Sequence, residues 1–158
     1  MRAGLPGLAT FAAVALVAML LDLATKALAL RLPPEGLTLL PVLNLHFGFN
    51  SGVSFGLFAG EGNSPWIVLL TGLALMALVV MGLRTECPAE RAGYALIAGG
   101  GFANLADRLH DGVVTDFIDL HAGGLHFPTF NLADVVITLG AALLLWTALR
   151  EHQTVQGS

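Results

Sequence analysis

Long apolar stretches without charge are the feature that most restricts how this chain can fold. Residues 3–21 and 62–83 contain no charged side chain, and residues 131–149 contain only Asp134. A helix that crosses a bilayer needs about 20 mostly apolar residues. Of the 158 residues, 56% are hydrophobic and only 11% are charged, whereas soluble domains carry roughly 25% charged residues. The sequence therefore predicts an integral membrane protein.

The apolar stretches predict a single membrane-embedded domain over residues 1–158. Four transmembrane helices are expected at about 5–30, 65–83, 92–110 and 131–149, followed by a mobile polar tail at 151–158. The third stretch is too short to cross without Asp107 and Arg108, which must lie within or at the edge of the bilayer. A cleaved signal peptide is the alternative for the first stretch. Asp22 and Lys26 argue against it, because charges sit poorly between an apolar core and a cleavage site.

Residues 37–60 differ from the apolar stretches and predict a small β-sheet cradle. From Leu43 to Asn50, apolar residues alternate with polar residues or glycine, which is typical of a half-buried strand. A glycine ladder from Gly48 to Gly60 is the alternative, since glycines at this spacing also pair helices. Residues 110–128 are expected to form an outer loop. The predicted fold class is an all-α integral membrane protein, with four transmembrane helices and a β-cradle on its outer face.

The distribution of basic residues predicts the orientation. Lysine and arginine are enriched in cytoplasmic loops. Arg31 falls on one side of the predicted membrane, and the other side carries Arg2, Arg84, Arg91 and Arg150. We therefore expect both termini to be cytoplasmic. The cradle, the outer loop and most of the unusual polar residues then converge on the outer face.

Charge and cysteine content exclude several classes of function. The net charge is −4 and no basic stripe is present, so nucleic acid is not an expected partner. The single Cys87 excludes an intramolecular disulfide and a CxxC motif. No compact metal-ligand spacing such as HExxH occurs, and neither a metal nor another cofactor is predicted. The alternative is a metal site assembled from the outer-face residues His110, Asp111, Asp116, Asp119, His121 and His126.

Asp116 and Asp134 are the candidate catalytic residues. Two carboxylates about 3 Å apart cannot both ionise, so they share a proton and can activate water for peptide hydrolysis. One aspartate precedes the last predicted span and the other begins it, so both can lie at one depth. Asn131 and Asp134 also fit the N-cap and N3 positions of a helix, whose dipole favours an ionised Asp134. The alternative is a non-enzymatic transporter or partner subunit, in which the polar groups form an ion path.

Short motifs along the chain resemble those of the lipoprotein signal peptidases, the type II signal peptidases of bacteria. The similarity extends from Asp22 to about Gly140. The matching residues, in order, are Asp22, Thr25 and Lys26; Asn50, Gly52 and Phe55; Gly99, Gly100, Asn104, Asp107 and Arg108; Val114, Asp116 and Phe117; and Phe130, Asn131, Ala133 and Asp134. Ala103 and Thr115 depart from the usual pattern, which has glycine and valine there. Neither difference removes a catalytic group.

This resemblance implies an intramembrane aspartic endopeptidase of the bacterial inner membrane, with its active site near the periplasmic face. Its substrates would be prolipoproteins already modified with diacylglyceryl, cut just before the lipidated cysteine. Membrane lipid and a globomycin-type inhibitor are further implied partners. Asp116 and Asp134 match the catalytic pair, and the positions matching the substrate site are Asn50, Gly52, Asn104, Arg108 and Asn131. Asp22, Lys26 and Asp107 are expected to be structural, with Asp107 pairing with a cation.

Overall fold

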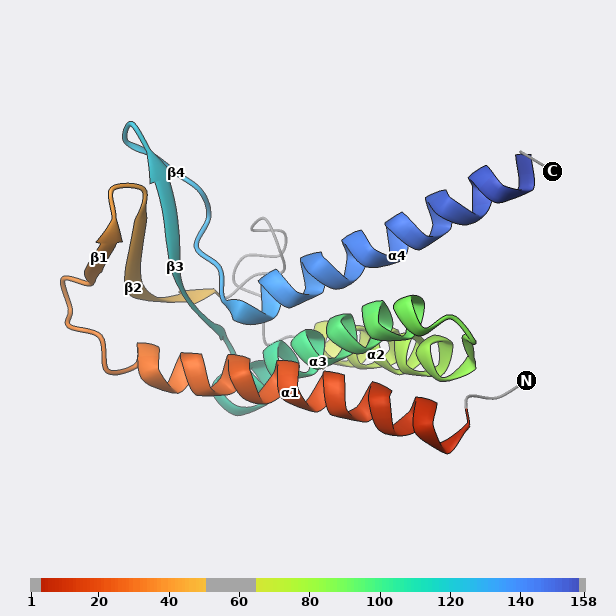
Figure 1. Ribbon diagram of the computed structural model, residues 1–158. Coiled ribbons are helices and arrows are strands. Elements are labelled where there is room, and N and C mark those ends of the chain that lie inside the picture. The colour runs from red at the N-terminus through yellow and green to blue at the C-terminus, as the bar shows by residue number, and fades with distance from the viewer. Residues whose placement is uncertain (1–3, 51–64, 157–158) are drawn as a thin grey trace.

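A computed structural model describes residues 4–50 and 65–156 of the chain. Most of these residues are helical, and a small antiparallel sheet adjoins one end of the helices (Figure 1). The start of α1 and the end of α4 both lie at the opposite end, where α4 diverges from the other helices (Figure 1). The elements, in chain order, are α1 (Leu5–Ala29), β1 (Leu37–Leu40), β2 (Leu43–Asn50), α2 (Pro65–Arg84), α3 (Pro88–Asp111), β3 (Val114–Ala122), β4 (Leu125–His126) and α4 (Leu132–Gln156).

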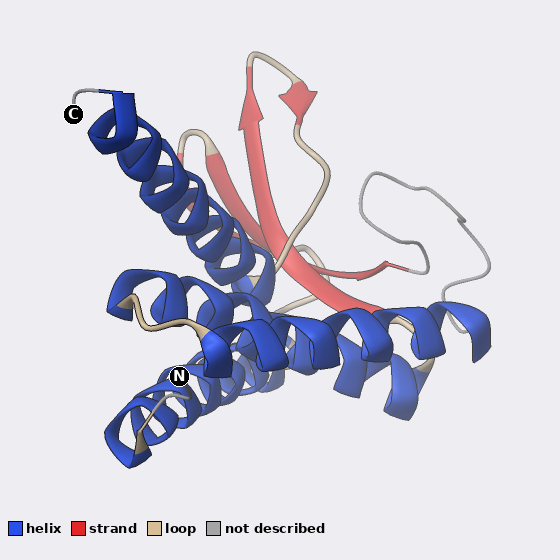
Figure 2. Ribbon diagram, turned by 90° about the vertical axis from the view of Figure 1, so that its right-hand side faces the viewer, coloured by secondary structure: helices blue, strands red, loops and turns tan. Residues whose placement is uncertain are grey.

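Helix α3 is the centre of the bundle, because α1, α2 and α4 all pack against it (Figure 2). Its glycine run, residues 99–101, makes these close contacts possible, since successive helical positions point in directions about 100° apart. A Cβ on the first glycine would meet the backbone of Ala15 in α1. On the second it would lie 2.7 Å from the carbonyl oxygen of Ala133 in α4, and on the third it would meet Leu75 in α2. Each of the three glycines therefore allows a different helix to pack closely against α3.

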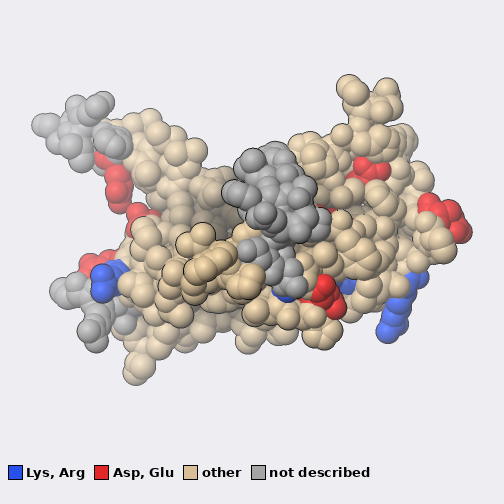
Figure 3. All heavy atoms as spheres, turned by 180° about the vertical axis from the view of Figure 1, so that it is seen from behind, with Lys and Arg blue, Asp and Glu red and all other residues tan. Residues whose placement is uncertain are grey.

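Within residues 4–50 and 65–156, three helices are long and apolar enough to cross a membrane: Leu5–Ala29, Pro65–Arg84 and Leu132–Glu151. Large apolar side chains on them, such as Leu70 and Leu145, are exposed, as expected of surface that faces lipid. Uncharged residues cover most of the face shown in Figure 3. Helix α3 does not meet the same criterion, because its sequence includes Glu90, Arg91, Asp107 and Arg108. The fourth predicted transmembrane helix is therefore a proposal that rests on the central position of α3.

The sheet has the strand order β1-β2-β3-β4, and each neighbouring pair is antiparallel. The alternation from Leu43 to Asn50 predicts a strand, and β2 confirms it. Its pairing with β3 places Gly48 opposite Asp116 and Asn50 opposite Val114. The end of β2 is thereby held beside the first half of β3. The remainder of the predicted cradle, residues 51–60, lies outside the described residues.

One sequence-based expectation is wrong. The region expected to be an outer loop contains β3, whose residues Val114–Phe117 are consecutively buried. A strand buried on both faces lacks the alternation that identifies a half-exposed strand. In addition, α4 continues to Gln156, so the expected tail at 151–158 is helical over most of its length. Helix α3 also begins at Pro88, somewhat before the predicted start of the third span.

Candidate active site

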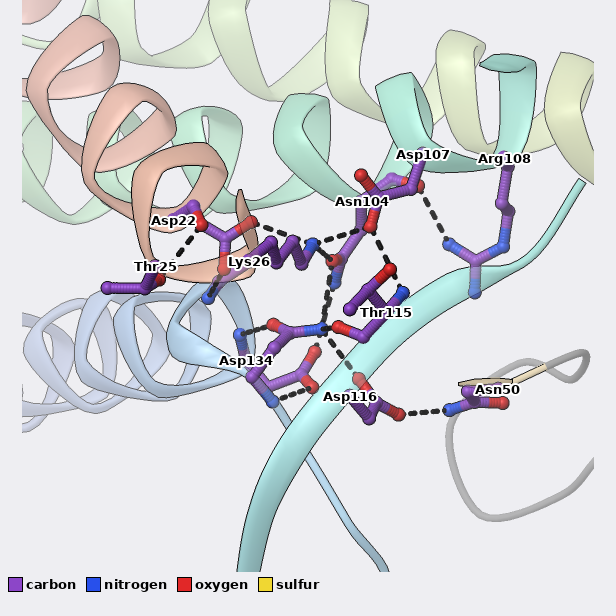
Figure 4. Close-up of polar contacts among 12 residues, drawn as sticks. Asp22, Thr25, Lys26, Asn50, Asn104, Asp107, Arg108, Thr115, Asp116 and Asp134 are labelled. Carbon is purple, nitrogen blue, oxygen red and sulfur yellow. Dashed lines mark hydrogen bonds and ion pairs between the residues drawn. The ribbon is translucent and has the colours of Figure 1, made fainter. Parts of the chain in front are cut away.

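A buried polar cluster lies where α1, α3, β3 and the start of α4 meet (Figure 4). Asp22 and Lys26 come from α1, Asp116 from β3, and Asn131 precedes α4. These four side chains are almost completely buried, with relative exposures of 0%, 4%, 1% and 0% respectively. Buried polar groups are retained when they are paired or hydrogen-bonded. The contacts within the cluster therefore define its chemistry.

Asn131 links the two candidate catalytic aspartates directly. Its Nδ2 donates to Asp116 Oδ1 over 2.7 Å. Its Oδ1 accepts from the backbone N–H of Asp134 at 3.0 Å, and its own backbone N–H donates to Asp134 Oδ2 at 3.2 Å. This reciprocal pair confirms the predicted capping arrangement at the start of α4. One asparagine thus holds both the strand-borne and the helix-borne aspartate.

Asn104 of α3 provides a second support for Asp134. Its Nδ2 donates to Asp134 Oδ1 over 3.0 Å, and its Oδ1 accepts from Asn131 Nδ2 at 3.2 Å. The two oxygens of Asp134 therefore receive separate N–H groups, one from Asn104 and one from the Asn131 backbone. These two donors fix the position of the Asp134 carboxyl group at the start of α4.

Asp116 lies in a different electrostatic environment. Burial raises its pKa to about 6, and the neighbouring charge of Asp134 acts in the same direction. Hydrogen bonds from Asn50 and Asn131 oppose this rise in the pKa. The Asn50 contact joins Nδ2 to Asp116 Oδ2 over 2.9 Å. Burial therefore makes Asp116 a carboxyl group that holds a proton more readily than an exposed aspartate does.

Lys26 is the cation of the cluster. Its Nζ lies 2.7 Å from Asp22 Oδ2 and 2.9 Å from Asp107 Oδ2, and it donates to Asn104 Oδ1 over 2.7 Å. The predicted pairing of Asp22 with Lys26, and that of Asp107 with a cation, are both confirmed. Each carboxylate also accepts a backbone N–H: Asp22 from Ala133 at 2.7 Å and Asp107 from Thr115 at 3.1 Å. This ion cluster joins α1, α3, β3 and α4.

Arg108 and Asn50 border the cluster, as Figure 4 shows. Arg108 Nη1 contacts the backbone oxygen of Asn104 at 3.5 Å. Gly52, the remaining residue expected at the substrate site, lies outside the described residues. Thr115 contributes through its backbone, because its carbonyl oxygen accepts from Asn131 Nδ2 at 3.3 Å. Apart from its position next to Asp116, nothing in the amino-acid sequence predicts this role of Thr115.

Two of the histidines expected on the outer face, His110 and His126, pair with acidic residues outside this cluster. His126 Nδ1 lies 2.9 Å from Asp119 Oδ1, and this hydrogen bond holds the pKa of Asp119 below its usual value. His110 pairs with Asp111 at the exposed end of α3. Among residues 4–50 and 65–156, no three histidine, cysteine or acidic side chains gather in a metal-binding arrangement.

The fold and the cluster define a helical membrane protein with an enzyme-like polar centre. Residues 14–150 match the family model described as Signal peptidase (SPase) II. A lipoprotein signal peptidase of Cronobacter sakazakii is 42% identical over 137 residues, 82% of each chain. One from Pelagibacter ubique is 38% identical over 142 residues, covering 86% of this chain and 85% of that protein. The chain belongs to the signal peptidase II family.

Two solved structures share the overall fold of this chain. A bacterial membrane enzyme determined at 2.3 Å resolution superimposes with a TM-score of 0.82 and 26% sequence identity, covering 92% of this chain and 91% of that one. A second, at 1.9 Å resolution, gives a TM-score of 0.77 with 27% identity, covering 89% of this chain and 93% of that one. The protein therefore shares its overall fold with membrane enzymes.

Proposed function

We propose that this protein is an intramembrane aspartic endopeptidase. It removes the signal peptide from diacylglyceryl-modified prolipoproteins, cutting just before the lipidated cysteine. The observation that carries the proposal is the position of Asn131, which donates to Asp116 at 2.7 Å and caps Asp134 through two further hydrogen bonds. Asn131 thus bonds both carboxyl groups, that of Asp116 through its side chain and that of Asp134 through its backbone N–H. One residue bonded to both groups keeps them in a fixed relation, as a catalytic pair requires.

The surroundings of the two aspartates support a division of labour. Asp134 receives N–H groups from Asn104 and Asn131 and lies in the first turn of α4, so we assign it as the ionised base. Asp116, whose pKa is raised to about 6, is the proton donor. Asp134 takes a proton from water as the water oxygen attacks the scissile carbonyl carbon, and Asp116 protonates the carbonyl oxygen.

The resulting diol collapses when the C–N bond breaks. Asp134 gives its proton to the leaving amine, and Asp116 recovers one from a diol hydroxyl. One water is consumed and both aspartates return to their initial states. The titration of such a pair belongs to the two groups together.

The substrate is held by residues around the pair. Arg108 offers its guanidinium donors to backbone carbonyls of the peptide, while Asn50, Gly52, Asn104 and Asn131 complete the site. Exposed Leu40 and Leu125 on the sheet support contact with membrane lipid beside the lipidated substrate. A globomycin-type inhibitor occupies the same site.

The protein resides in the bacterial inner membrane with four spans and both termini in the cytoplasm. Two features support this topology. The start of α1 and the end of α4 lie at the end of the bundle opposite the sheet (Figure 1). The polar cluster adjoins the sheet at the other end, which supports an active site near the periplasmic face.

The test uses purified protein in lipid or detergent with a diacylglyceryl-modified prolipoprotein, with and without a chelator. Wild type is expected to cut before the lipidated cysteine whether or not chelator is present. Asp116→Asn and Asp134→Asn are expected to lose at least about a thousandfold in rate. Asp111→Asn, which changes an exposed carboxylate, is the matched control and should retain wild-type cleavage. Cleavage that survives either active-site substitution would overturn the aspartic mechanism.

A further inference from the structure

The buried cation Lys26 takes no part in the chemistry proposed above. It is 4% exposed and lies between Asp22, Asp107 and the side-chain oxygen of Asn104. A buried ion cluster is weak evidence for stability, because desolvation offsets much of the attraction between its charges. A role that depends on the placement of this charge therefore needs to be considered.

Lys26 determines which way the Asn104 amide faces. The cation contacts the amide oxygen at 2.7 Å, while the amide nitrogen donates to Asp134 Oδ1 at 3.0 Å. The opposite orientation would put N–H groups against the ammonium and the amide oxygen against the carboxylate. Both contacts would then be repulsive, so the ammonium selects the orientation in which Asn104 donates to Asp134.

The orientation of the Asn104 amide also affects Asp116, through Asn131. The Asn104 oxygen that faces Lys26 also accepts from Asn131 Nδ2 at 3.2 Å. That Nδ2 in turn donates to Asp116 Oδ1 at 2.7 Å. A reversed Asn104 would present an N–H group to Asn131 and oppose this arrangement. Lys26 therefore favours a single direction for the hydrogen bonds that reach both aspartates (Figure 4).

We propose that Lys26 is a positioning residue for the aspartate pair, which it acts upon through the Asn104 amide and through its own positive charge. This inference rests on the proposed function. The amide holds an N–H group against Asp134, and the charge stabilises the singly ionised pair. Lys26 itself does not contact the substrate or transfer a proton.

The charged groups around Lys26 determine what its removal should do. Asp22 faces it from α1, Asp107 and Arg108 belong to α3, and beyond Asn104 lie Asp116 of β3 and Asp134 of α4. Replacing Lys26 by a neutral residue leaves the pair in a more negative environment. Both limbs of the pH profile of kcat/KM should then move to higher pH. Neutralising Asp107 should move both limbs to lower pH.

The experiment compares Lys26→Met and Asp107→Asn with wild type, using Asp111→Asn as the control. Both limbs are expected to move up by about one pH unit in Lys26→Met and down in Asp107→Asn, because a nearby opposite charge shifts titration by about that amount or more. The control should keep the wild-type limbs. In Lys26→Met, kcat is also expected to fall at least tenfold, with KM changed less than threefold. Lower activity with unmoved limbs would mean that Lys26 is merely structural, and would overturn the proposal.

Lys26→Met leaves Asp22 and Asp107 without their cation, which can prevent this variant from folding. A second variant with balanced charge keeps the proposal testable in that case. Lys26→Met combined with Asp107→Asn removes one charge of each sign. The double variant still lacks the ammonium group that orients the Asn104 amide. We therefore expect kcat to fall at least tenfold, and a wild-type kcat would overturn the proposal. The proposed function has its own test: it is overturned if Asp116→Asn or Asp134→Asn remains active.

Discussion

The backbone N–H of Ala133 donates to Asp22 Oδ1 over 2.7 Å, although the two residues are 111 positions apart. The bond joins the first turn of α4, whose N–H groups have no partner within the helix, to the C-terminal third of α1. Asp22 is fully buried and also pairs with Lys26. This aspartate therefore connects the two terminal helices beside the candidate active site.

Asp22→Ala is expected to destabilise the protein by about 3–5 kcal/mol, since it removes one partner of a buried ion pair and leaves the Ala133 N–H unpaired. The measurement is the free energy of unfolding in detergent. Asp111→Ala is the control, because its carboxylate is 55% exposed and pairs with the exposed His110. Its effect should stay within about 0.5 kcal/mol. Equal stabilities for the two variants would contradict the role given to Asp22.

Gly100→Ala should weaken both stability and activity. An added Cβ would lie 2.7 Å from the carbonyl oxygen of Ala133, so α3 and α4 must move apart at the turn that carries Asp134. A loss of about 1–3 kcal/mol is expected from such overpacking, together with slower cleavage.

Gly72→Ala on α2 is the matched control for this prediction. There the added Cβ would have its nearest neighbour, Leu105 Cδ2, at 4.0 Å. Alanine also favours helix more than glycine does, so stability and cleavage should be unchanged or slightly improved. If Gly100→Ala behaves like Gly72→Ala, the close approach of α3 and α4 is not required.

Local sequence spacing was sufficient to predict parts of this cluster. Asp22 and Lys26 are four residues apart on one helix, a spacing that brings their side chains together wherever the helix lies. Asn131 and Asp134 stand at the N-cap and N3 positions of α4, where the backbone itself provides the donors. Both contacts are present, because each depends on a single helix.

Contacts between distant elements could not be predicted in the same way. Lys26 reaches Asn104 across 78 positions, and this pairing depends on how closely α1 approaches α3 at its glycine run. Strand β3 was also missed, because its burial comes from the helices and from β2. Polar residues such as Asp116 suggest a solvated loop until those neighbours are known. The shape of the site therefore depends on packing that no short motif encodes.

Cys87→Ser is expected to leave cleavage unchanged. Cys87 is the N-cap of α3 and makes no side-chain capping hydrogen bond, and it stands at the end of this helix far from Asn104 and Asp107. Serine is a favoured N-cap residue, so stability should be equal or slightly higher. Cleavage assays and thermal unfolding check both points. Complete loss of activity in a folded Cys87→Ser protein would mean that a group required for cleavage lies at the end of α3 far from Asn104 and Asp107. That result would contradict the proposed location of the active site.

The protonation of Asp116 should be visible in the pH dependence of stability. Its pKa is raised from 3.8 to about 6 in the folded protein, so between these values the folded state binds more protons than the unfolded state. Stability from this residue is therefore present at low pH and is lost as the pH rises through about 6. Asp116→Asn removes the effect, and relative to wild type it should be more stable at pH 7 than at pH 4.

Asp119→Asn should behave in the opposite way, which makes it the matched comparison on the same strand. Because the hydrogen bond with His126 holds the pKa of Asp119 below its usual value, its contribution is present at neutral pH and is lost as the pH falls below about 4. Relative to wild type, this variant should be less stable at pH 7 than at low pH. Thermal unfolding of the three proteins from pH 3 to pH 7 tests both signs. Parallel curves for wild type and Asp116→Asn would mean that burial does not raise the pKa of Asp116, and would remove one support for its role as the proton donor.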